Sequence, residues 1–300
     1  MRILLLGGSG QVGHEIIRLS AQSGITCVAP SSSEVNIADE QAVLACIEKS
    51  LPLDFVVNAS AYTAVDKAES EEELAYRVNA TGPSVLAKAC NDKDIPLIHI
   101  STDYVFAGKA DTPYTETSAV NPLTVYGASK LAGEKAVMDS MTDYIILRTS
   151  WVYSSHGNNF VKTMLRLGAE RDALSIIDDQ TGCPTSAENI ATVILGLINS
   201  ISTSSQPEWG LYHYSDKTVT TWFGFAREIF ECASELDDGY TSPTLSPITT
   251  EEYPTPAKRP LYSVLDCVKL LKDYGITQQP LRKSLQKVVT QLKNSLTTSA

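Results

Sequence analysis

The sequence predicts an α/β fold with a doubly wound parallel sheet of the Rossmann type and a smaller, loop-rich C-terminal lobe. Short apolar runs alternate with helical patterns through the first 150 residues, which favours a parallel sheet covered by helices. A glycine-rich turn follows the first apolar run, and five prolines interrupt residues 236–261. We expect a dinucleotide-binding unit at 1–152, with added elements from about 172–215, and a substrate lobe with closing helices mainly from 153–171 and 216–300.

The first predicted strand, residues 3–6, consists of four apolar residues and leads into Gly7, Gly10 and Gly13. A helical pattern follows at residues 14–22. A strand, a glycine turn and a helix in this order are the context of a dinucleotide-binding fingerprint. The glycines let the backbone approach a pyrophosphate, and the helix N-terminus favours its negative charge.

The second predicted strand, residues 25–29, leads into Pro30 and three serines. A strict NAD enzyme usually places an acidic residue here for the ribose 2′-hydroxyl. No unambiguous acid stands at the strand end, and no Lys or Arg is nearby to bind a 2′-phosphate. The choice between NADH and NADPH therefore stays open. A helix is expected next, at residues 40–49.

The third predicted strand, residues 53–58, ends in small residues that let a ligand lie against the backbone. Asp66 and Glu69 have the spacing of a capping box, which predicts a helix start with Asp66 as the cap. The helical pattern of residues 76–91 contains Gly82-Pro83, which predicts a break or restart.

The fourth predicted strand, residues 97–100, leads directly to Thr102 and Asp103. We expect His99, inside this strand, to be a packed side chain. After a polar loop, Tyr126 and Lys130 are four residues apart and share one face of the next helix. An ammonium beside a phenol favours the phenolate, so we expect Lys130 to lower the pKa of Tyr126 toward a value suited to proton transfer.

The later chain predicts strands at residues 144–147, 174–177 and 210–214. Helices are expected at 161–167, 188–199 and 221–233, with closing helices at 264–274 and 281–292. Residues 236–261 show little periodicity, which predicts a loop-rich cover over a substrate.

Composition narrows the function classes. The net charge of −11 argues against binding to nucleic acid or to an anionic membrane surface. The six cysteines are scattered without a Cys-x-x-Cys pair, which indicates buried thiols in a reducing compartment rather than zinc or redox chemistry. Without a signal-peptide pattern or a membrane-length apolar run, a cytoplasmic location is expected.

Together these motifs resemble the extended short-chain dehydrogenase/reductase family and, within it, the dTDP-4-dehydrorhamnose reductases. The matching runs cover most of the chain: AVDKAE at 64–69, STDYVF at 101–106, YGASKLAGE at 126–134, RTSWVY at 148–153, GNNF at 157–160, DQTGCPT at 179–185, and Arg259-Pro260. The resemblance implies that NADPH or NADH reduces the C4 ketone of a dTDP-sugar, dTDP-4-dehydro-β-L-rhamnose, to dTDP-L-rhamnose.

The resemblance also implies residue roles. Tyr126 would donate the proton, Lys130 would lower the Tyr126 pKa and contact the nicotinamide ribose, and Thr102 would hydrogen-bond the carbonyl oxygen. Besides Tyr126 and Lys130, the implied cofactor contacts are Gly7, Gly10, Gln11, Val12, Gly13, Asn36, Ile37, Ala61, Tyr62 and Thr63. Thr102, Asp103 and Trp151 would contact the sugar nucleotide. Arg259 is the candidate for its diphosphate, because a guanidinium fork suits phosphate oxygens.

Some reductases of this type form dimers around a divalent ion, such as Mg²⁺, held by three glutamates. Glu15 and Glu188 match two of these positions, but Gln291 stands at the third. A neutral amide oxygen is a weaker ligand than a carboxylate for a hard cation. We therefore expect no tightly held metal, and either a monomer or a homodimer.

Two other functions stay open. The chain could act on another nucleotide-sugar, as a reductase, an epimerase or a dehydratase. Dehydratases of this superfamily carry an acidic pair after the strand-end threonine, whereas Tyr104 follows Asp103 here. It could also be a non-catalytic NADP-binding regulatory subunit, like those of methionine adenosyltransferase. Retention of Thr102, Tyr126 and Lys130 favours catalysis.

Overall fold

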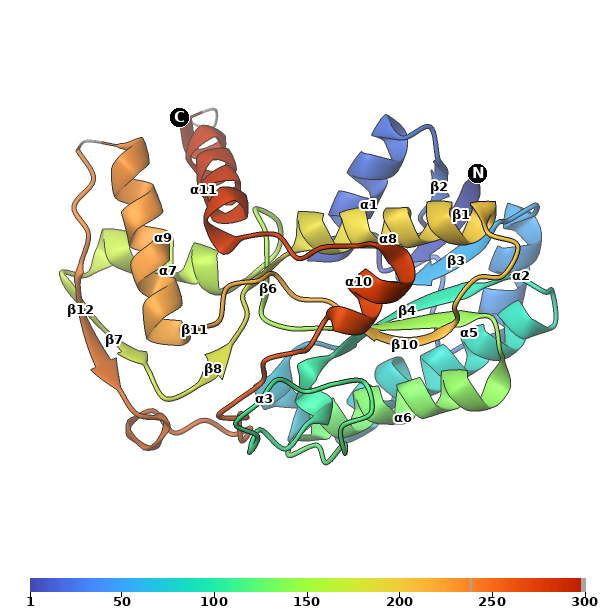
Figure 1. Ribbon diagram of the computed structural model, residues 1–300, viewed down its shortest axis with the longest axis horizontal. Coiled ribbons are helices and arrows are strands. Elements are labelled where there is room, and N and C mark those ends of the chain that lie inside the picture. The colour runs from blue at the N-terminus through green and yellow to red at the C-terminus, as the bar shows by residue number, and fades with distance from the viewer. Residues whose placement is uncertain (238, 298–300) are drawn as a thin grey trace.

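A six-stranded parallel sheet forms the centre of the larger lobe in the computed structural model (Figure 1), which describes residues 1–237 and 239–297. The strand order is β10-β5-β4-β3-β1-β2, and every pairing is parallel. The strands are β1 (Arg2–Leu6), β2 (Thr26–Val28), β3 (Phe55–Asn58), β4 (Leu97–Thr102), β5 (Tyr144–Thr149) and β10 (Gly210–His213). The predicted doubly wound α/β fold is confirmed.

The strand order reverses beside β1. The chain goes from β1 outward to β2 and then crosses to β3 on the other side of β1. In an open parallel sheet, ligands bind outside the carboxyl ends of the strands at such a switch point. The turn after β1 and the segment after β3 therefore border the expected crevice.

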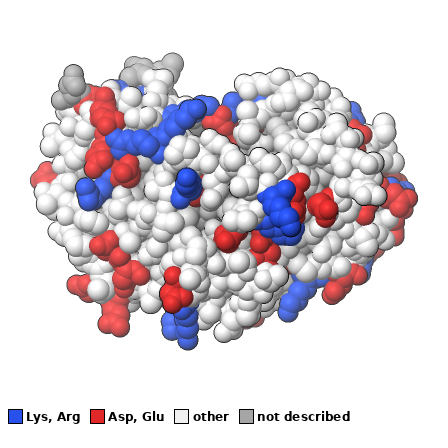
Figure 2. Space-filling view, viewed as in Figure 1, with Lys and Arg blue, Asp and Glu red and all other residues white. Residues whose placement is uncertain are grey.

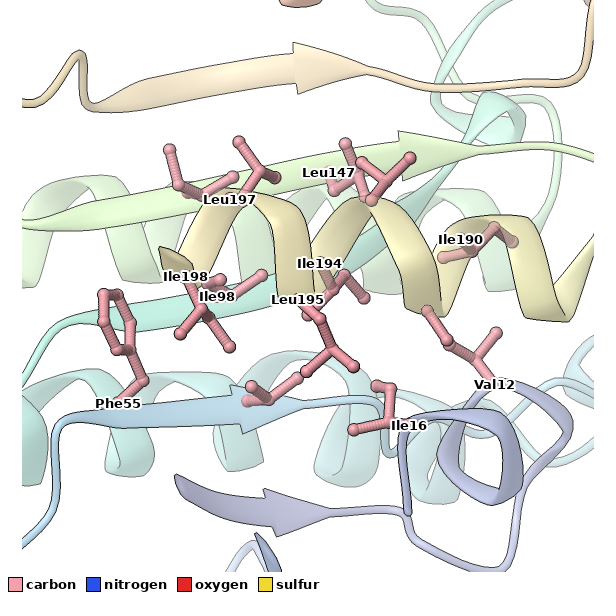
Figure 3. Packing of buried hydrophobic residues seen from close by; sticks show 14 of the residues in the cluster. Val12, Ile16, Phe55, Ile98, Leu147, Ile190, Ile194, Leu195, Leu197 and Ile198 are labelled. Carbon is pink, nitrogen blue, oxygen red and sulfur yellow. The ribbon is translucent and has the colours of Figure 1, made fainter. Parts of the chain in front are cut away.

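Helices cover both faces of the sheet. On one face lie α1 (Gln11–Gln22) and α8 (Ala187–Thr203), and on the other lie α2 (Glu40–Ser50), α5 (Gly82–Asn91) and α6 (Val125–Ser140) (Figure 1). Figure 3 shows Ile194 and Ile198 of α8 among the strand residues Phe55, Ile98 and Leu147. Apolar residues occupy both faces of the central strands because both faces are covered.

The second lobe packs helices around a small two-stranded sheet. Its helices are α7 (Phe160–Glu170), α9 (Trp222–Leu236) and α11 (Leu281–Thr297), and its sheet pairs β7 (Ala173–Ile177) with β12 (Thr244–Ile248) in parallel. Short pairs also join β6 (Val152–Tyr153) to β9 (Thr185–Ser186) and β8 (Thr181–Gly182) to β11 (Thr220–Thr221). A short helix, α10 (Val268–Tyr274), returns toward β10 in the larger lobe.

The sequence-based boundaries need two corrections and one refinement. Residues 236–261 are not all loop, because β12 forms inside them. The proline within this strand, Pro247, is one reason why the pattern indicated a loop. Gly82-Pro83 marks a restart rather than a break, because α4 (Glu72–Tyr76) leads through a π-helical turn at Arg77–Thr81 into α5, which begins at Gly82. Asp66 does not cap a helix, because it lies inside the short helix α3 (Val65–Ala68).

The division into two units remains a proposal. The pairings place α8 and β10 with the first unit, in keeping with the added elements expected there. They place β7 with the second unit, because its partner is β12. We therefore propose that residues 173–177 belong with the substrate lobe.

Charged side chains of both signs are interspersed on the surface. On the face in Figure 2, Lys and Arg lie in small groups next to Asp and Glu. One such group joins α9 to α11, where Arg282 contacts Glu228 at 2.7 Å and Glu231 at 3.3 Å. Within the described residues, no helix has the length and apolar character needed to cross a membrane.

Candidate active site

The glycine turn after β1 packs closely against the end of β3. Gly7 has a φ of +86°, and a Cβ there would lie 2.4 Å from the backbone nitrogen of Ser60. A Cβ on Gly13 would lie 2.2 Å from the carbonyl oxygen of Gly7. Only glycine fits both positions, so the fingerprint spacing is explained by the tight turn itself.

The N-terminus of α1 is suited to a dinucleotide pyrophosphate. Gly10 precedes the helix without a side-chain cap, and the first turn holds no acidic residue. The amide groups and the positive end of the helix dipole therefore face the crevice without competition from a carboxylate. Val12 is buried in the core below, so only its backbone is placed to contact a cofactor.

Gln11 instead ties this turn to the second lobe. Its side-chain oxygen accepts hydrogen bonds from the Ser154 hydroxyl at 3.1 Å and from the Asn159 amide at 3.0 Å. Asn159 also caps α7 by accepting from the backbone of Lys162. The Gln11 side chain therefore links the glycine turn to Ser154 and Asn159 through hydrogen bonds.

Other predicted cofactor residues follow β2 and β3 in the chain. The Asn36 side chain accepts from the backbone of Ala38 at 3.1 Å, and Ile37 is buried against Gly82 of α5. Ala61 and Tyr62 are half-buried after β3, and Thr63 is exposed. The Tyr62 hydroxyl donates to Glu71 at 2.6 Å.

Asn79 was missed by sequence reasoning. Its side-chain oxygen accepts from the backbone nitrogen of Tyr62 at 2.8 Å, and its amide donates to the Tyr62 carbonyl at 3.0 Å and to the Ser129 hydroxyl at 3.0 Å. Asn79 lies in the π-helical turn and is 1% exposed. It fixes the segment after β3 against α6, and the expected break or restart at Gly82-Pro83 gave no signal of a π-helical turn at Asn79.

Tyr126, Lys130 and Thr102 come together at the carboxyl end of β4. The Thr124 side chain caps α6 by accepting from Gly127 at 3.0 Å, which places Tyr126 in the first turn and Lys130 one turn later. Both side chains are buried, and Thr102 is the last residue of β4. The ring of Tyr104 packs edge-on against Tyr126, with centroids 5.5 Å apart.

The expected lowering of the Tyr126 pKa is wrong for this structure. Burial raises the pKa of Tyr126 to about 12, and a hydrogen bond with Thr102 opposes the rise only in part. The Lys130 ammonium donates to the carbonyl oxygen of Ile100 at 2.7 Å, and burial lowers the Lys130 pKa to about 8. Desolvation outweighs the attraction that the four-residue spacing suggested.

Asp103 is buried beside Thr102. The Thr102 hydroxyl donates to the Asp103 carboxylate at 3.0 Å and accepts from the backbone of Tyr104 at 3.2 Å. Burial raises the pKa of Asp103 to about 6. His99 is fully buried as expected, with its Nδ1 atom 3.0 Å from the Asn58 side-chain nitrogen.

Trp151 follows β5 in an unusual conformation. Its φ is +46°, and its ring stacks on Trp222 of the second lobe with centroids 3.6 Å apart. A Cβ on Gly182 would lie 2.5 Å from the Trp151 ring. Backbone strain at a half-buried aromatic residue beside a crevice is typical of functional positions, and the stacking holds the ring between the two lobes.

A cavity of about 670 Å³ lies in the second lobe beside Trp222. It is lined by apolar residues of α7 and β7 and by Gln180, Trp222 and Arg259. The Arg259 guanidinium pairs with both Asp66 oxygens, at 3.1 and 2.8 Å. Through this ion pair, Asp66 of α3 holds Arg259, the predicted diphosphate contact, against the larger lobe.

The two glutamates considered for a metal are ion-paired with cations. Arg18 contacts Glu15 at 2.7 Å and Glu188 at 2.8 Å, and Lys287 contacts Glu188 at 2.5 Å. Within the described residues, no three His, Cys, Asp or Glu side chains are grouped to hold a metal ion.

Comparison with known proteins gives a consistent family. The model of the RmlD substrate binding domain matches residues 1–294. The chain is 41% identical to a dTDP-4-dehydrorhamnose reductase of Salmonella typhimurium, over 99% of this chain and 100% of that protein. It is similar to a crystal structure of a dTDP-4-dehydrorhamnose reductase from Clostridium acetobutylicum, with a TM-score of 0.90 and 38% identity over 98% of this chain and 100% of that one. The Bacillus anthracis reductase in complex with NADP gives a TM-score of 0.88 and 35% identity, over 97% of this chain and 99% of that one.

Proposed function

The chain belongs to the RmlD substrate binding domain family, and on this premise we propose that it reduces dTDP-4-dehydrorhamnose at C4 to dTDP-rhamnose. It is an NAD(P)H-dependent oxidoreductase of dTDP-rhamnose biosynthesis, as its full-length similarity to reductases of this name supports. The structural observation that carries the site assignment is the convergence of buried Thr102, Tyr126 and Lys130 at the carboxyl edge of the sheet, beside the glycine turn.

Tyr126 is proposed as the general acid. Because burial raises its pKa, the phenol stays protonated at neutral pH and can give its proton to the C4 oxygen of the sugar. The Thr102 hydroxyl, whose single proton is directed at Asp103 in this structure, would turn to donate that proton to the same oxygen as negative charge develops on it. Asp103 orients Thr102 through the hydrogen bond between their side chains.

Lys130 is proposed to hold the ribose of the nicotinamide. Its ammonium would also supply the positive charge that stabilises the Tyr126 phenolate after proton transfer. The bound NAD(P)H supplies the hydride that adds to C4. Gly7, Gly10 and Gly13 would leave room for the pyrophosphate at the start of α1. The further proposed contacts are Gln11, Val12, Asn36, Ile37, Ala61, Tyr62 and Thr63.

The substrate is proposed to extend from Thr102 past Trp151 into the cavity of the second lobe. Arg259 is the proposed diphosphate contact, and it lines that cavity. A diphosphate reaching Arg259 would replace Asp66 as its partner, and both anions suit the guanidinium fork.

We propose a cytoplasmic location, where the nucleotide-sugar and the reduced cofactor are available. The six cysteines are all free thiols, and four of them are buried, which suits a reducing compartment. The proposed assembly is a monomer or a homodimer, without nucleic acid or membrane as a partner.

The test is the consumption of NADPH with dTDP-4-dehydrorhamnose generated enzymatically in situ. We expect turnover and dTDP-L-rhamnose as the product, identified by mass spectrometry and NMR. Cofactor binding without turnover would instead support the regulatory-subunit alternative. Turnover only with other 4-keto nucleotide-sugars would place the chain with a different substrate.

A further inference from the structure

Behind Lys130, a buried ion pair joins α6 to two strands of the sheet. The Glu134 carboxylate accepts from Arg148 of β5 through Nε at 2.8 Å and Nη2 at 2.6 Å. The same carboxylate accepts from the Ser101 hydroxyl of β4 at 2.5 Å. Glu134 is 0% and Arg148 2% exposed, and neither touches the predicted cofactor or substrate residues through a hydrogen bond.

The ion pair lies directly beside the active-site residues, both on α6 and on β4. Lys130 and Glu134 are four residues apart on α6, so they share one face. They form hydrogen bonds with successive residues of β4: Lys130 donates to the carbonyl of Ile100, and Glu134 accepts from the hydroxyl of Ser101. The next residue of that strand is Thr102. Ser101 also pairs in register with Arg148 across the sheet.

The surroundings of Arg148 hold the pair in one position. Its guanidinium lies over the ring of Phe106, 5.1 Å from the centroid, and its Nη1 atom is 3.5 Å from Nε2 of His213. His213 is in turn within 3.0 Å of the Tyr114 carbonyl through Nδ1. A bidentate pair between planar groups, packed on both sides, permits little sliding of α6 along the sheet.

We propose that Glu134, Arg148 and Ser101 are positioning residues that set the distance of Tyr126 and Lys130 from Thr102. This inference rests on the proposed function, because the reaction requires those three side chains to converge on one carbonyl oxygen. Burying two charges is costly, and well-packed apolar residues often replace such a pair without loss of stability. Because the pair adds little to stability, we assign it a role in catalysis rather than in support of the fold.

The experiment compares the wild-type enzyme with Glu134→Gln, Arg148→Lys and Ser101→Ala. Glu134→Gln keeps the shape of the side chain, Arg148→Lys keeps the charge but loses the bidentate contact, and Ser101→Ala leaves the ion pair intact. Asp216→Asn is the matched control, because Asp216 is a fully buried carboxylate bonded to Asn189 and Ser186 in another part of the chain. Tm is measured first, and assays are run well below the lowest Tm.

We expect kcat to fall at least tenfold in Glu134→Gln and Arg148→Lys, with the KM for the sugar nucleotide within threefold of the wild type. Ser101→Ala should give a smaller fall. The Kd of NADPH, measured by fluorescence without substrate, should rise at least threefold in Glu134→Gln, since Lys130 is displaced. Asp216→Asn should lower Tm while keeping kcat within twofold.

The pH dependence of kcat distinguishes a positioning role of Glu134 from a role in fold stability alone. Lys130 interacts with Glu134 on its own helix and with His99 on β4, and the Glu134 carboxylate raises the Lys130 pKa against desolvation. In Glu134→Gln the alkaline limb of the kcat profile should therefore move to lower pH, whereas Asp216→Asn should leave it in place.

Two outcomes would overturn the proposal. One is a folded Glu134→Gln or Arg148→Lys enzyme with kcat and NADPH affinity near wild type. The other is a loss of kcat that simply follows Tm across all four variants, Asp216→Asn included. A wild-type enzyme that binds NADPH but does not reduce the sugar would count against the proposed function instead, and the NADPH titrations would still test the positioning role.

Discussion

At the residue scale, burial sets the acid–base behaviour of the site. Tyr126 and Lys130 are both removed from water, so burial raises the pKa of the phenol and lowers that of the ammonium. Both shifts favour the neutral forms. A neutral phenol is the form that a reductase needs when it gives a proton to the substrate.

Replacing Tyr126 by Phe should remove most of the activity while leaving the cofactor bound. The ring still packs against Tyr104, but no proton can be delivered, so kcat should fall by about 10²-fold or more. Lys130→Met should impair both kcat and NADPH affinity. Steady-state rates with fluorescence titration of NADPH measure both effects, and a near-normal rate in Tyr126→Phe would assign the acid to another group.

Asp103 should make the stability of the protein depend on pH. Burial raises its pKa from the ordinary value of 3.8 to about 6, so the folded state binds this proton more tightly than the unfolded state. The resulting stabilisation is complete below pH 3.8 and is lost as the pH rises through 6. Relative to Asp103→Asn, the wild type should therefore lose about 2 kcal/mol between pH 4.5 and 8.

Urea unfolding of both proteins across this pH range measures the difference. The substitution of the exposed Asp111 by Asn is the control for a change of net charge. A constant difference between wild type and Asp103→Asn would show that the folded and unfolded states share the same pKa at this position.

At the scale of elements, two glycines allow α6 to approach its neighbours closely. A Cβ on Gly127 would lie 2.2 Å from the carbonyl oxygen of Tyr104, and one on Gly133 would lie 2.0 Å from that of Asn79. The first contact sets the helix against the turn after β4, and the second sets it against the π-helical turn. Rigid backbone stands opposite each glycine, so the helix itself would have to move.

Gly133→Ala should destabilise the protein by at least about 2 kcal/mol, because an inserted methyl group overpacks a rigid contact. Gly196→Ala is the matched control inside α8, where the nearest atom to a new Cβ is 3.9 Å away. It should be neutral or stabilise by up to about 1 kcal/mol, as expected for alanine in a helix. Equal free energies of unfolding for the two variants would contradict the close approach of α6 and Asn79.

The turn after β2 should accept both cofactors. Glu34 accepts from the backbone and the hydroxyl of Ser31, both at 2.8 Å, and no Lys or Arg occurs between Arg18 and Lys49. With neither a cation for a 2′-phosphate nor a free acid at the strand end, kcat/KM for NADH and NADPH should agree within about tenfold, or 1.4 kcal/mol. A thousandfold preference would reveal a ribose contact from another part of the chain.

The same elements show how far sequence reasoning reaches. The six strands of the main sheet and the glycine turn were predictable, because apolar runs and turn residues are local signals. β12 was not, since its pairing with β7 is settled by tertiary contacts. The contact of Asn79 with Tyr62 and the pairing of Asp66 with Arg259 join residues far apart in the chain. The Tyr126 pKa depends on burial, which spacing alone does not give.

At the scale of the whole molecule, cations of this chain pair with the two glutamates that match the metal ligands of related reductases. Arg18 and Lys287 bring α1, α8 and α11 together around Glu188. A divalent ion would have to displace both cations, and Gln291 offers only a neutral oxygen. The ion pairs therefore link α1 and α8 of the larger lobe to α11 of the second lobe without a metal ion.

Activity and oligomeric state should be unchanged by EDTA. Sedimentation velocity and NADPH consumption, each with and without chelator and with added Mg²⁺, measure this directly. An EDTA-sensitive dimer that Mg²⁺ restores and Glu188→Ala abolishes would show that the glutamates do bind a metal.

The late position of α8 in the chain has a consequence for synthesis on the ribosome. The first five strands of the main sheet are complete at Thr149, but the helix that covers Phe55, Ile98 and Leu147 begins only at Ala187 and ends at Thr203. At typical elongation rates of 5–20 residues per second, the roughly 50 intervening residues take about 3–10 s to make. During that interval α1 covers only part of this face, so the nascent chain exposes apolar strand residues that chaperones can shield.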